Sequence, residues 1–345
     1  MKVDVAWLTV NRMCNLKCRW CYAQEFISQG STMGLELAQQ LLDILGELGV
    51  KKIYLIGGEP TIHPQFFNIL QLTIDQGFET VVVTNAVALS SEKFCREIFS
   101  LNHPKLQFGI SIKGITEKEY IDNCGIDAFN RVLMGIRNCE VYGFNYSLSY
   151  VLTTDNIDTV DNFAQKFHAY IPNKGITFAL CNDVVLQDGE ILKNNLHPLK
   201  IERVFREKYD ILCSKLNMQF SLHQIFPLCQ CDEDLLNLME SRNQLYTSCH
   251  VHNRDGIIFD ETGGLLLCNH LAGFQIGKYG VDFSDAESLI EYWDSDHLME
   301  LHRKLTTMPA ERCSTCKKAM FCGGGCCIQW FSHTFSSFEQ YKYKS

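Results

Sequence analysis

Cysteines gather near the start of the chain with a regular spacing. Cys14, Cys18 and Cys21 form a Cys-x3-Cys-x2-Cys pattern directly after a short apolar run. Three thiolates can bind three irons of a cubane 4Fe-4S cluster and leave the fourth iron without a protein ligand. That iron can bind a small molecule through amino and carboxylate groups. A zinc site is the alternative, but zinc favours two-residue gaps and four ligands, and no fourth Cys or His lies nearby in the sequence.

A second group of seven cysteines lies toward the end of the chain. Its spacing is Cys-x13-Gly-x4-Cys, then Cys-x2-Cys-x5-Cys-x3-Cys-Cys. We expect these residues to be metal ligands, and their resemblance to a known cysteine-rich extension implies one or two auxiliary 4Fe-4S clusters. A zinc ribbon remains an alternative, because two-residue gaps also suit zinc. The expected ligands are Cys249, Cys268, Cys313, Cys316, Cys322, Cys326 and Cys327.

Two fully ligated clusters need one thiolate more than this group supplies. One cluster could keep an open iron, or Cys229 or Cys231 could complete it. A third possibility is a single cluster held by Cys249, Cys268, Cys313 and Cys316. Cys326 and Cys327 are adjacent and would point in different directions unless the backbone bends sharply.

The composition is that of an ordinary folded protein with too many cysteines. The chain has 345 residues, 46% of them hydrophobic, and 17 cysteines. In a reducing compartment such thiols are better interpreted as metal ligands than as disulfides. A net charge of −9 argues against nucleic acid as a partner. We found no signal peptide and no apolar run of membrane-spanning length, so the sequence predicts a cytoplasmic protein without a membrane partner.

Short β-rich runs alternate with amphipathic stretches up to about residue 185. This is the pattern of βα units around a parallel sheet. Six units fall short of the eight of a closed barrel, so we expect an α/β fold with a partial (β/α)6 TIM-like barrel and its functional groups at the C-terminal strand ends. The six runs are 5–10, 53–56, 80–84, 106–112, 146–153 and 176–181.

The sequence suggests three regions. Residues 1–185 form the partial barrel. Residues 186–245 lack strand periodicity and contain two charged helical stretches, 199–216 and 232–242, so we expect a helical connecting segment. Residues 246–345, with paired glycines and cysteines, are expected to form a small domain stabilised by iron–sulfur clusters.

The cysteine loop resembles the signature of the radical S-adenosylmethionine (SAM) superfamily. Gly57-Gly58-Glu59-Pro60, after the second strand, resembles that family's Gly-Gly-Glu motif, which meets the methionyl amino group of SAM. Glycines let the backbone approach a neighbour closely, and a carboxylate or carbonyl accepts from an ammonium group. The resemblance implies a cluster that binds SAM and cleaves it reductively to a 5'-deoxyadenosyl radical. It also implies SAM-binding roles for Gly57, Gly58, Glu59, Thr84, Asn85, Ser111, Lys113 and Asn156, all near strand ends; many relatives have an acidic residue where Lys113 stands.

The C-terminal cysteines resemble the SPASM extension, which carries auxiliary iron–sulfur clusters in radical SAM enzymes that mature peptides. The seven-cysteine form of that extension has a last cysteine well downstream, whereas no cysteine follows Cys327 here. The resemblance implies a peptide substrate and modification by crosslinking, thioether formation or epimerisation. It also implies an external electron donor of flavodoxin or ferredoxin type. Because the first strand starts almost at Met1, we expect a separate protein or the open sheet edge to bind a leader peptide.

Several catalytic candidates lie outside the ligand sets. Related sulfatase maturases place an aspartate after the second auxiliary cysteine, but here Asn269 follows Cys268. An amide cannot accept a proton at neutral pH, which disfavours formylglycine formation, although His270 could substitute. Epimerisation needs a hydrogen donor, and Cys229 and Cys231 are candidates. The alternatives are a dehydrogenase of a small alcohol or sugar and a non-enzymatic, metal-stabilised electron-transfer scaffold.

Overall fold

The computed structural model describes residues 2–223 and 226–332. Contacts divide the chain into two units. The first contains residues 1–147 and 254–301, and the second contains residues 148–253 and 302–345. No helix within the described ranges combines the length and apolarity that a membrane crossing requires.

The first unit is built on a mainly parallel sheet with the strand order β4-β3-β2-β1-β11-β12-β13. β1 pairs in parallel with β2 on one side and with β11 on the other, so that Ala6 lies between Ile53 and Ile257. β12 and β13 continue the sheet in antiparallel pairs. The strands are β1 (Val5–Asn11), β2 (Lys52–Gly57), β3 (Glu79–Thr84), β4 (Leu106–Ile112), β11 (Gly256–Phe259), β12 (Gly264–Leu266) and β13 (Gly277–Lys278).

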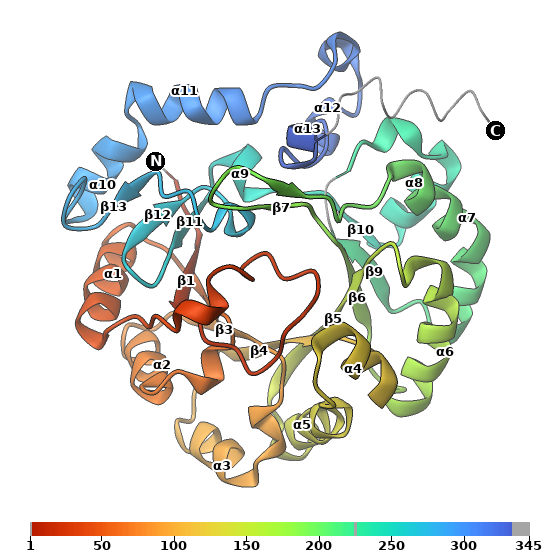
Figure 1. The fold of residues 1–345 in the computed structure, drawn as a ribbon, viewed down its shortest axis with the longest axis horizontal. Coiled ribbons are helices and arrows are strands. Elements are labelled where there is room, and N and C mark those ends of the chain that lie inside the picture. Colours follow the sequence, from red (N-terminus) through yellow and green to blue (C-terminus); the bar gives the residue numbers. More distant parts are fainter. Residues whose placement is uncertain (1, 224–225, 333–345) are drawn as a thin grey trace. The chain divides into compact units, whose positions relative to one another are not determined.

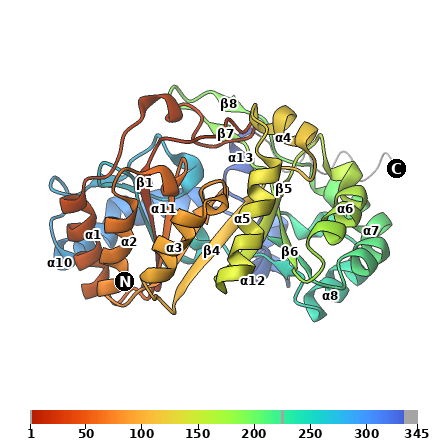
Figure 2. The ribbon, with the colours of Figure 1, turned by 90° about the horizontal axis from the view of Figure 1, so that it is seen from below.

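Amphipathic helices follow the parallel strands of this unit. In α1, Ala38, Leu41, Leu42 and Leu45 are buried, which is the helical spacing that the sequence predicts. Figure 1 shows α1, α2 and α3 outside the strands, and Figure 2 shows the dark red loop after β1 beyond one end of them. The helices are α1 (Leu35–Glu47), α2 (Phe66–Asp75), α3 (Glu92–Ser100), α4 (Glu117–Cys124), α5 (Phe129–Tyr142), α10 (Ala286–Trp293) and most of α11 (Asp296–Leu305).

The second unit contains four parallel strands in the order β5-β6-β9-β10. A short antiparallel pair, β7 and β8, stands apart from them. The strands are β5 (Asn145–Leu152), β6 (Ile176–Leu180), β7 (Val184–Val185), β8 (Ile191–Leu192), β9 (Phe220–His223) and β10 (Leu245–Tyr246). The helices are α6 (Val160–Tyr170), α7 (Pro198–Lys215), α8 (Glu233–Ser241), α9 (His250–Asn253), α12 (Ala319–Cys322) and α13 (Gln329–Ser332), with 3-10 turns η5 (Leu228–Gln230) and η7 (Glu311–Thr315).

The expected α/β class is confirmed, and β1 to β6 occupy the six predicted runs within one or two residues. The segment 186–245 differs from expectation. It contains the two predicted helices, α7 and α8, but also β9, whose Phe220 pairs with Ile176 of β6. β9 has only four residues, too few to establish a two-residue period. The three predicted regions remain a prediction, and the two units above divide the chain differently.

Candidate functional site

The Gly-Gly-Glu motif after β2 holds the start of the cysteine loop. Gly58 N–H donates to Asn11 O at 2.9 Å, and Glu59 N–H donates to Met13 O at 2.7 Å. A Cβ atom on Gly58 would lie 2.1 Å from Met13 O, and one on Gly57 would lie 2.5 Å from Asn11 O. Both positions therefore require glycine because two backbone segments meet there.

The Glu59 carboxylate is buried and fully occupied by neighbouring donors. It accepts hydrogen bonds from the hydroxyls of Thr61 and Thr84, both at 2.6 Å, and from the N–H groups of Thr61 and Asn85. Burial raises the pKa of Glu59, while these donors oppose that shift. The carboxylate thus joins the C-terminal ends of β2 and β3. The side chain of Asn85 donates onward to Asn15 Oδ1, inside the cysteine loop, at 2.7 Å.

The three cysteines of the loop differ in environment. Burial raises the pKa of Cys14 to about 12 and also raises that of Cys21. Cys18 is the exception, because its sulfur lies 3.8 Å from the sulfur of Cys124. With Cys18 ionised, the Cys124 thiol is the donor, and this hydrogen bond lowers the pKa of Cys18 to about 6. Cys124 ends α4 and has no exposed surface.

The end of β4 and the end of α4 flank the same loop. Lys113 Nζ donates to Ser111 Oγ at 2.6 Å. After the Cys124 hydrogen bond, the positive charge of Lys113 also helps to lower the pKa of Cys18, and at Cys21 it partly opposes the rise in pKa that burial causes. The main chain of α4 also anchors the loop, since Lys17 N–H donates to Cys124 O at 3.0 Å. Thus Ser111 and Lys113 lie near the cysteine loop. The positive charge of Lys113 favours the thiolate form of a nearby cysteine.

The segment 254–301 also contacts the loop within the first unit. Arg12, two residues before Cys14, forms a buried ion pair with Glu261 at 2.6 Å, and Glu261 accepts from Ser31 Oγ at 2.7 Å. The ring of His270 lies 5.0 Å from that of Tyr22, centroid to centroid. The residue proposed as a substitute base is therefore next to the cysteine loop.

Asn156 belongs to the second unit, where its side chain forms hydrogen bonds within the turn that contains it. Its Oδ1 accepts from Thr153 N–H at 2.8 Å, and its Nδ2 donates to Val151 O and Tyr150 OH. These bonds shape the turn that follows β5. The structure provides a local role for this side chain, and its predicted contact with SAM stays a prediction.

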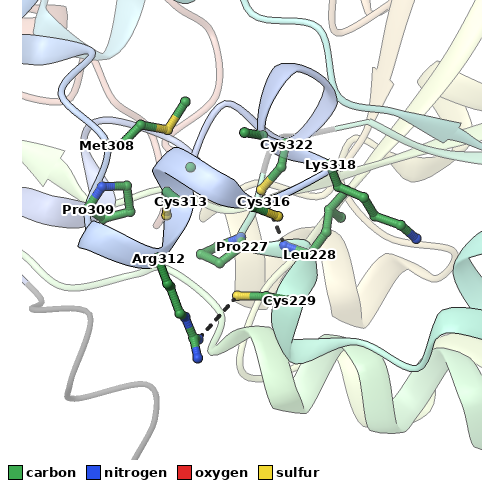
Figure 3. Close-up of a pocket in the computed structure, with 12 residues that line it drawn as sticks. Pro227, Leu228, Cys229, Met308, Pro309, Arg312, Cys313, Cys316, Lys318 and Cys322 are labelled. Atoms are coloured by element: carbon green, nitrogen blue, oxygen red, sulfur yellow. Dashed lines mark hydrogen bonds between the residues drawn. The ribbon is translucent and has the colours of Figure 1, made fainter.

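The C-terminal cysteines are shared between the units. Cys268 belongs to the first unit, and the other six belong to the second. Cys313, Cys316 and Cys322 line one cavity together with Cys229 (Figure 3). Cys326 and Cys327, which follow Cys322 in the sequence, are both buried. A hydrogen bond from the Cys327 thiol lowers the pKa of Cys326. The three glycines just before this pair, 323–325, all have positive φ angles.

Among the described residues, no three His, Cys, Asp or Glu side chains are arranged to hold one common metal ion. A single zinc ion requires several ligands that converge on one point. An iron–sulfur cubane differs because each thiolate binds its own iron. The three sulfurs of the loop after β1, with nearby positive charge, fit that second requirement.

Comparison with known proteins agrees with this geometry. Residues 8–167 match the model of the radical SAM superfamily. This part of the chain is therefore similar to the radical SAM superfamily. The match spans β1 to α6 and therefore includes the cysteine loop, the Gly-Gly-Glu motif and the ends of β3 and β4.

Curated relatives resemble only part of this chain. Fe-coproporphyrin III synthase of Methanosarcina barkeri (strain Fusaro / DSM 804) is 31% identical over 45% of this chain and 38% of its own. A probable GTP 3',8-cyclase of Sulfurisphaera tokodaii is 26% identical over 45% of this chain and 49% of its own. Mycofactocin maturase MftC of Mycobacterium tuberculosis (strain CDC 1551 / Oshkosh) is 25% identical, with coverages of 59% and 50%. The chain thus spans about half the length of the curated relatives it matches.

Solved structures share the fold over nearly the whole chain. Streptococcus suis SuiB bound to precursor peptide SuiA superposes with a TM-score of 0.71 and 16% identity, covering 100% of this chain and 74% of that one. The enzyme anSMEcpe with bound AdoMet and a peptide gives 0.68 and 18%, with coverages of 98% and 96%. At these identities the likeness concerns the fold.

Some residues of the site had no signal in the sequence. Cys124 is one, because a single cysteine in a periodic helix resembles a buried core residue. Arg12 and Glu261 are a second case, since 249 positions separate them. Only the parallel pairing of β1 with β11 brings their segments together.

Proposed function

We propose that this chain is a radical SAM enzyme that cleaves SAM at Cys14, Cys18 and Cys21 and modifies a peptide. The observation that carries the proposal is the cysteine loop itself, held at the ends of β1 to β4 by Gly58, Glu59 and the last turn of α4. When bound, the 4Fe-4S cluster supplies one electron that breaks a carbon–sulfur bond of SAM, giving methionine and a 5'-deoxyadenosyl radical. An external donor of flavodoxin or ferredoxin type provides that electron.

Different groups in and around the cysteine loop bind the cluster and SAM. Cys14, Cys18 and Cys21 hold the cluster, and the positive charge of Lys113 favours the thiolates of Cys18 and Cys21. The Glu59 carboxylate already accepts four hydrogen bonds, so we assign it a structural role. The ammonium group of SAM is then left to main-chain carbonyl oxygens of the motif.

A peptide substrate is supported by the extent of the likeness. SuiB and anSMEcpe superpose on 100% and 98% of the chain, and both were solved with peptides. Sequence matches to two probable GTP 3',8-cyclases cover 45% and 56% of this chain. We therefore favour peptide maturation by crosslinking, thioether formation or epimerisation. A separate protein or the open sheet edge binds any leader segment, and the enzyme works in the reducing cytoplasm.

One experiment tests the cleavage step. Anaerobically reconstituted protein is incubated with dithionite and SAM, and 5'-deoxyadenosine is quantified by chromatography. We expect it from the unmodified chain and none from Cys18→Ala, because an iron loses its ligand. Cys95→Ala, in α3, is the matched control and should behave like the unmodified chain. Absence of 5'-deoxyadenosine from the unmodified chain would exclude the proposed enzyme class.

A second experiment tests the substrate class. The reconstituted enzyme is offered synthetic candidate precursor peptides or GTP, in D2O, and products are weighed by mass spectrometry. Loss of two hydrogens indicates a crosslink or thioether, and gain of one deuterium indicates epimerisation. Conversion of GTP with every peptide unchanged would replace the peptide proposal by a nucleotide substrate.

A further inference from the structure

A cavity of about 280 Å³ in the second unit is lined by four cysteines. Cys229 comes from η5, Cys313 from η7, Cys316 from the residue after η7, and Cys322 from the end of α12. Figure 3 shows their side chains among the lining residues. A water molecule occupies ~30 Å³ of liquid, so this space exceeds what one water or one bare ion needs.

The charges around the cavity suit an anionic occupant. Arg312 and Lys318 line it, and no Asp or Glu is among its described lining residues. The Arg312 guanidinium donates to Cys229 Sγ at 3.7 Å. Lys318 Nζ is buried without a hydrogen-bond acceptor among the described residues, and its ion-pair partner Glu233 is 3.8 Å away. Four thiolates around an iron–sulfur core carry net negative charge, which two such cations offset.

The segment that carries Cys229 is fixed against the C-terminal cysteines. Leu228 N–H donates to Cys322 Sγ at 3.5 Å. Pro227 packs against Gly325 so closely that a Cβ atom there would lie 2.8 Å from Pro227 Cδ. Gly325 also has a φ of +92°, which disfavours any other residue. The proximity of Cys229 to this cavity is therefore built into the local backbone.

Cys231, two residues further on, is placed differently. It is absent from the cavity lining, and its N–H donates to Leu228 O at 3.0 Å as the turn closes. Of the two cysteines in this segment that could complete a ligand set, the geometry selects Cys229.

We propose that Cys229, Cys313, Cys316 and Cys322 are the four thiolate ligands of one 4Fe-4S cluster in this cavity. Cys229 thus supplies the thiolate that the seven C-terminal cysteines lack. Because each iron then has a protein ligand, this cluster transfers electrons and binds no substrate. The inference deepens the proposed function, since it names an electron carrier for an oxidative reaction.

The test isolates this cluster from the one that binds SAM. In a chain that carries Cys14→Ala, Cys18→Ala and Cys21→Ala, iron, zinc and sulfide are quantified and the dithionite-reduced protein is examined by EPR. Adding Cys229→Ala should remove about one to four irons per chain and change the EPR signal, because a cubane loses one or all of its irons when a ligand is lost. Adding Cys231→Ala should leave both unchanged.

Three results would overturn the inference. The first is that Cys229→Ala changes neither the iron content nor the EPR signal. The second is that Cys231→Ala, instead of Cys229→Ala, removes iron, and the third is that the parent chain contains zinc in place of iron. Cys229→Ser guards against simple misfolding, since its hydroxyl should retain the cluster with a shifted EPR signal and unchanged circular dichroism. None of these readouts depends on SAM cleavage, so failure of the proposed function would show separately as missing 5'-deoxyadenosine.

Discussion

Gly57 and Gly58 have a structural role that is not apparent from the sequence. Two glycines after a strand suggest a backbone that approaches a ligand. In the structure, the positions where their Cβ atoms would lie are occupied by the backbone of Asn11 and Met13. The motif is therefore needed to seat the cysteine loop on β2, whatever else it binds.

Substituting Gly58 should consequently loosen the loop. Gly58→Ala places a Cβ 2.1 Å from Met13 O, so the two segments must separate. We expect a loss of about 1–3 kcal/mol in the free energy of unfolding, measured by chemical denaturation, and less iron retained at Cys14, Cys18 and Cys21. Gly34→Ala is the matched control, because nothing lies within 4 Å of its Cβ and its φ is −71°. Equal stability of the two variants would contradict this account.

The spacing of Cys14, Cys18 and Cys21 sufficed to predict a cluster loop, because ligand spacing is a local property. Cys124 could not be found in this way. Its contact with Cys18 depends on where α4 ends relative to the loop, and that follows from tertiary packing. Glu59 was predicted as a site residue, but the hydrogen bonds that its carboxylate accepts from Thr84 and Asn85 likewise depend on tertiary packing.

Among elements, long alternating strands were predictable and short ones were not. β4, β5 and β6 alternate between buried and less buried positions along their whole length, which a single sequence reveals. β9 has only four residues, too few to distinguish its alternation from chance, and all four residues of β11 are buried. Their partners, β6 and β1, are distant in sequence, and a sequence without aligned relatives carries no signal of pairing.

The turn between β11 and β12 supports the cysteine loop through one ion pair, and this can be tested. Arg12 and Glu261 have side-chain exposures of 3% and 7%. Glu261→Gln leaves the Arg12 charge buried without its counter-charge, so we expect a loss of about 3–5 kcal/mol in the free energy of unfolding. Asp4→Asn breaks the exposed ion pair of Asp4 with Lys51, in which the side-chain exposures are 52% for Asp4 and 77% for Lys51. This change should lower the free energy of unfolding by less than about 1 kcal/mol. A comparable loss in both variants would show that burial of the pair is irrelevant.

At the scale of the whole molecule, the two proposed clusters have separate ligand sets. Cys14, Cys18 and Cys21 lie in the first unit, and the four cavity cysteines lie in the second. Removing ligands of one cluster should therefore leave the other intact, because substitutions at sites without shared partners act independently.

That independence predicts a specific uncoupling. Cys316→Ala removes an exposed ligand of the cavity, so the fold is disturbed little, and SAM cleavage at the N-terminal loop should persist. For crosslinking or thioether formation, the two oxidative modifications, the peptide product should fall well below the amount of 5'-deoxyadenosine, because the electron released on oxidation of the substrate loses its acceptor. The ratio of product to 5'-deoxyadenosine, both measured by mass spectrometry in one reaction, reports this directly. Cys213→Ala, on α7 and outside the cavity lining, should keep the ratio of the unmodified chain. A Cys316→Ala variant that forms full product would mean that the cavity cluster takes no part in the oxidation.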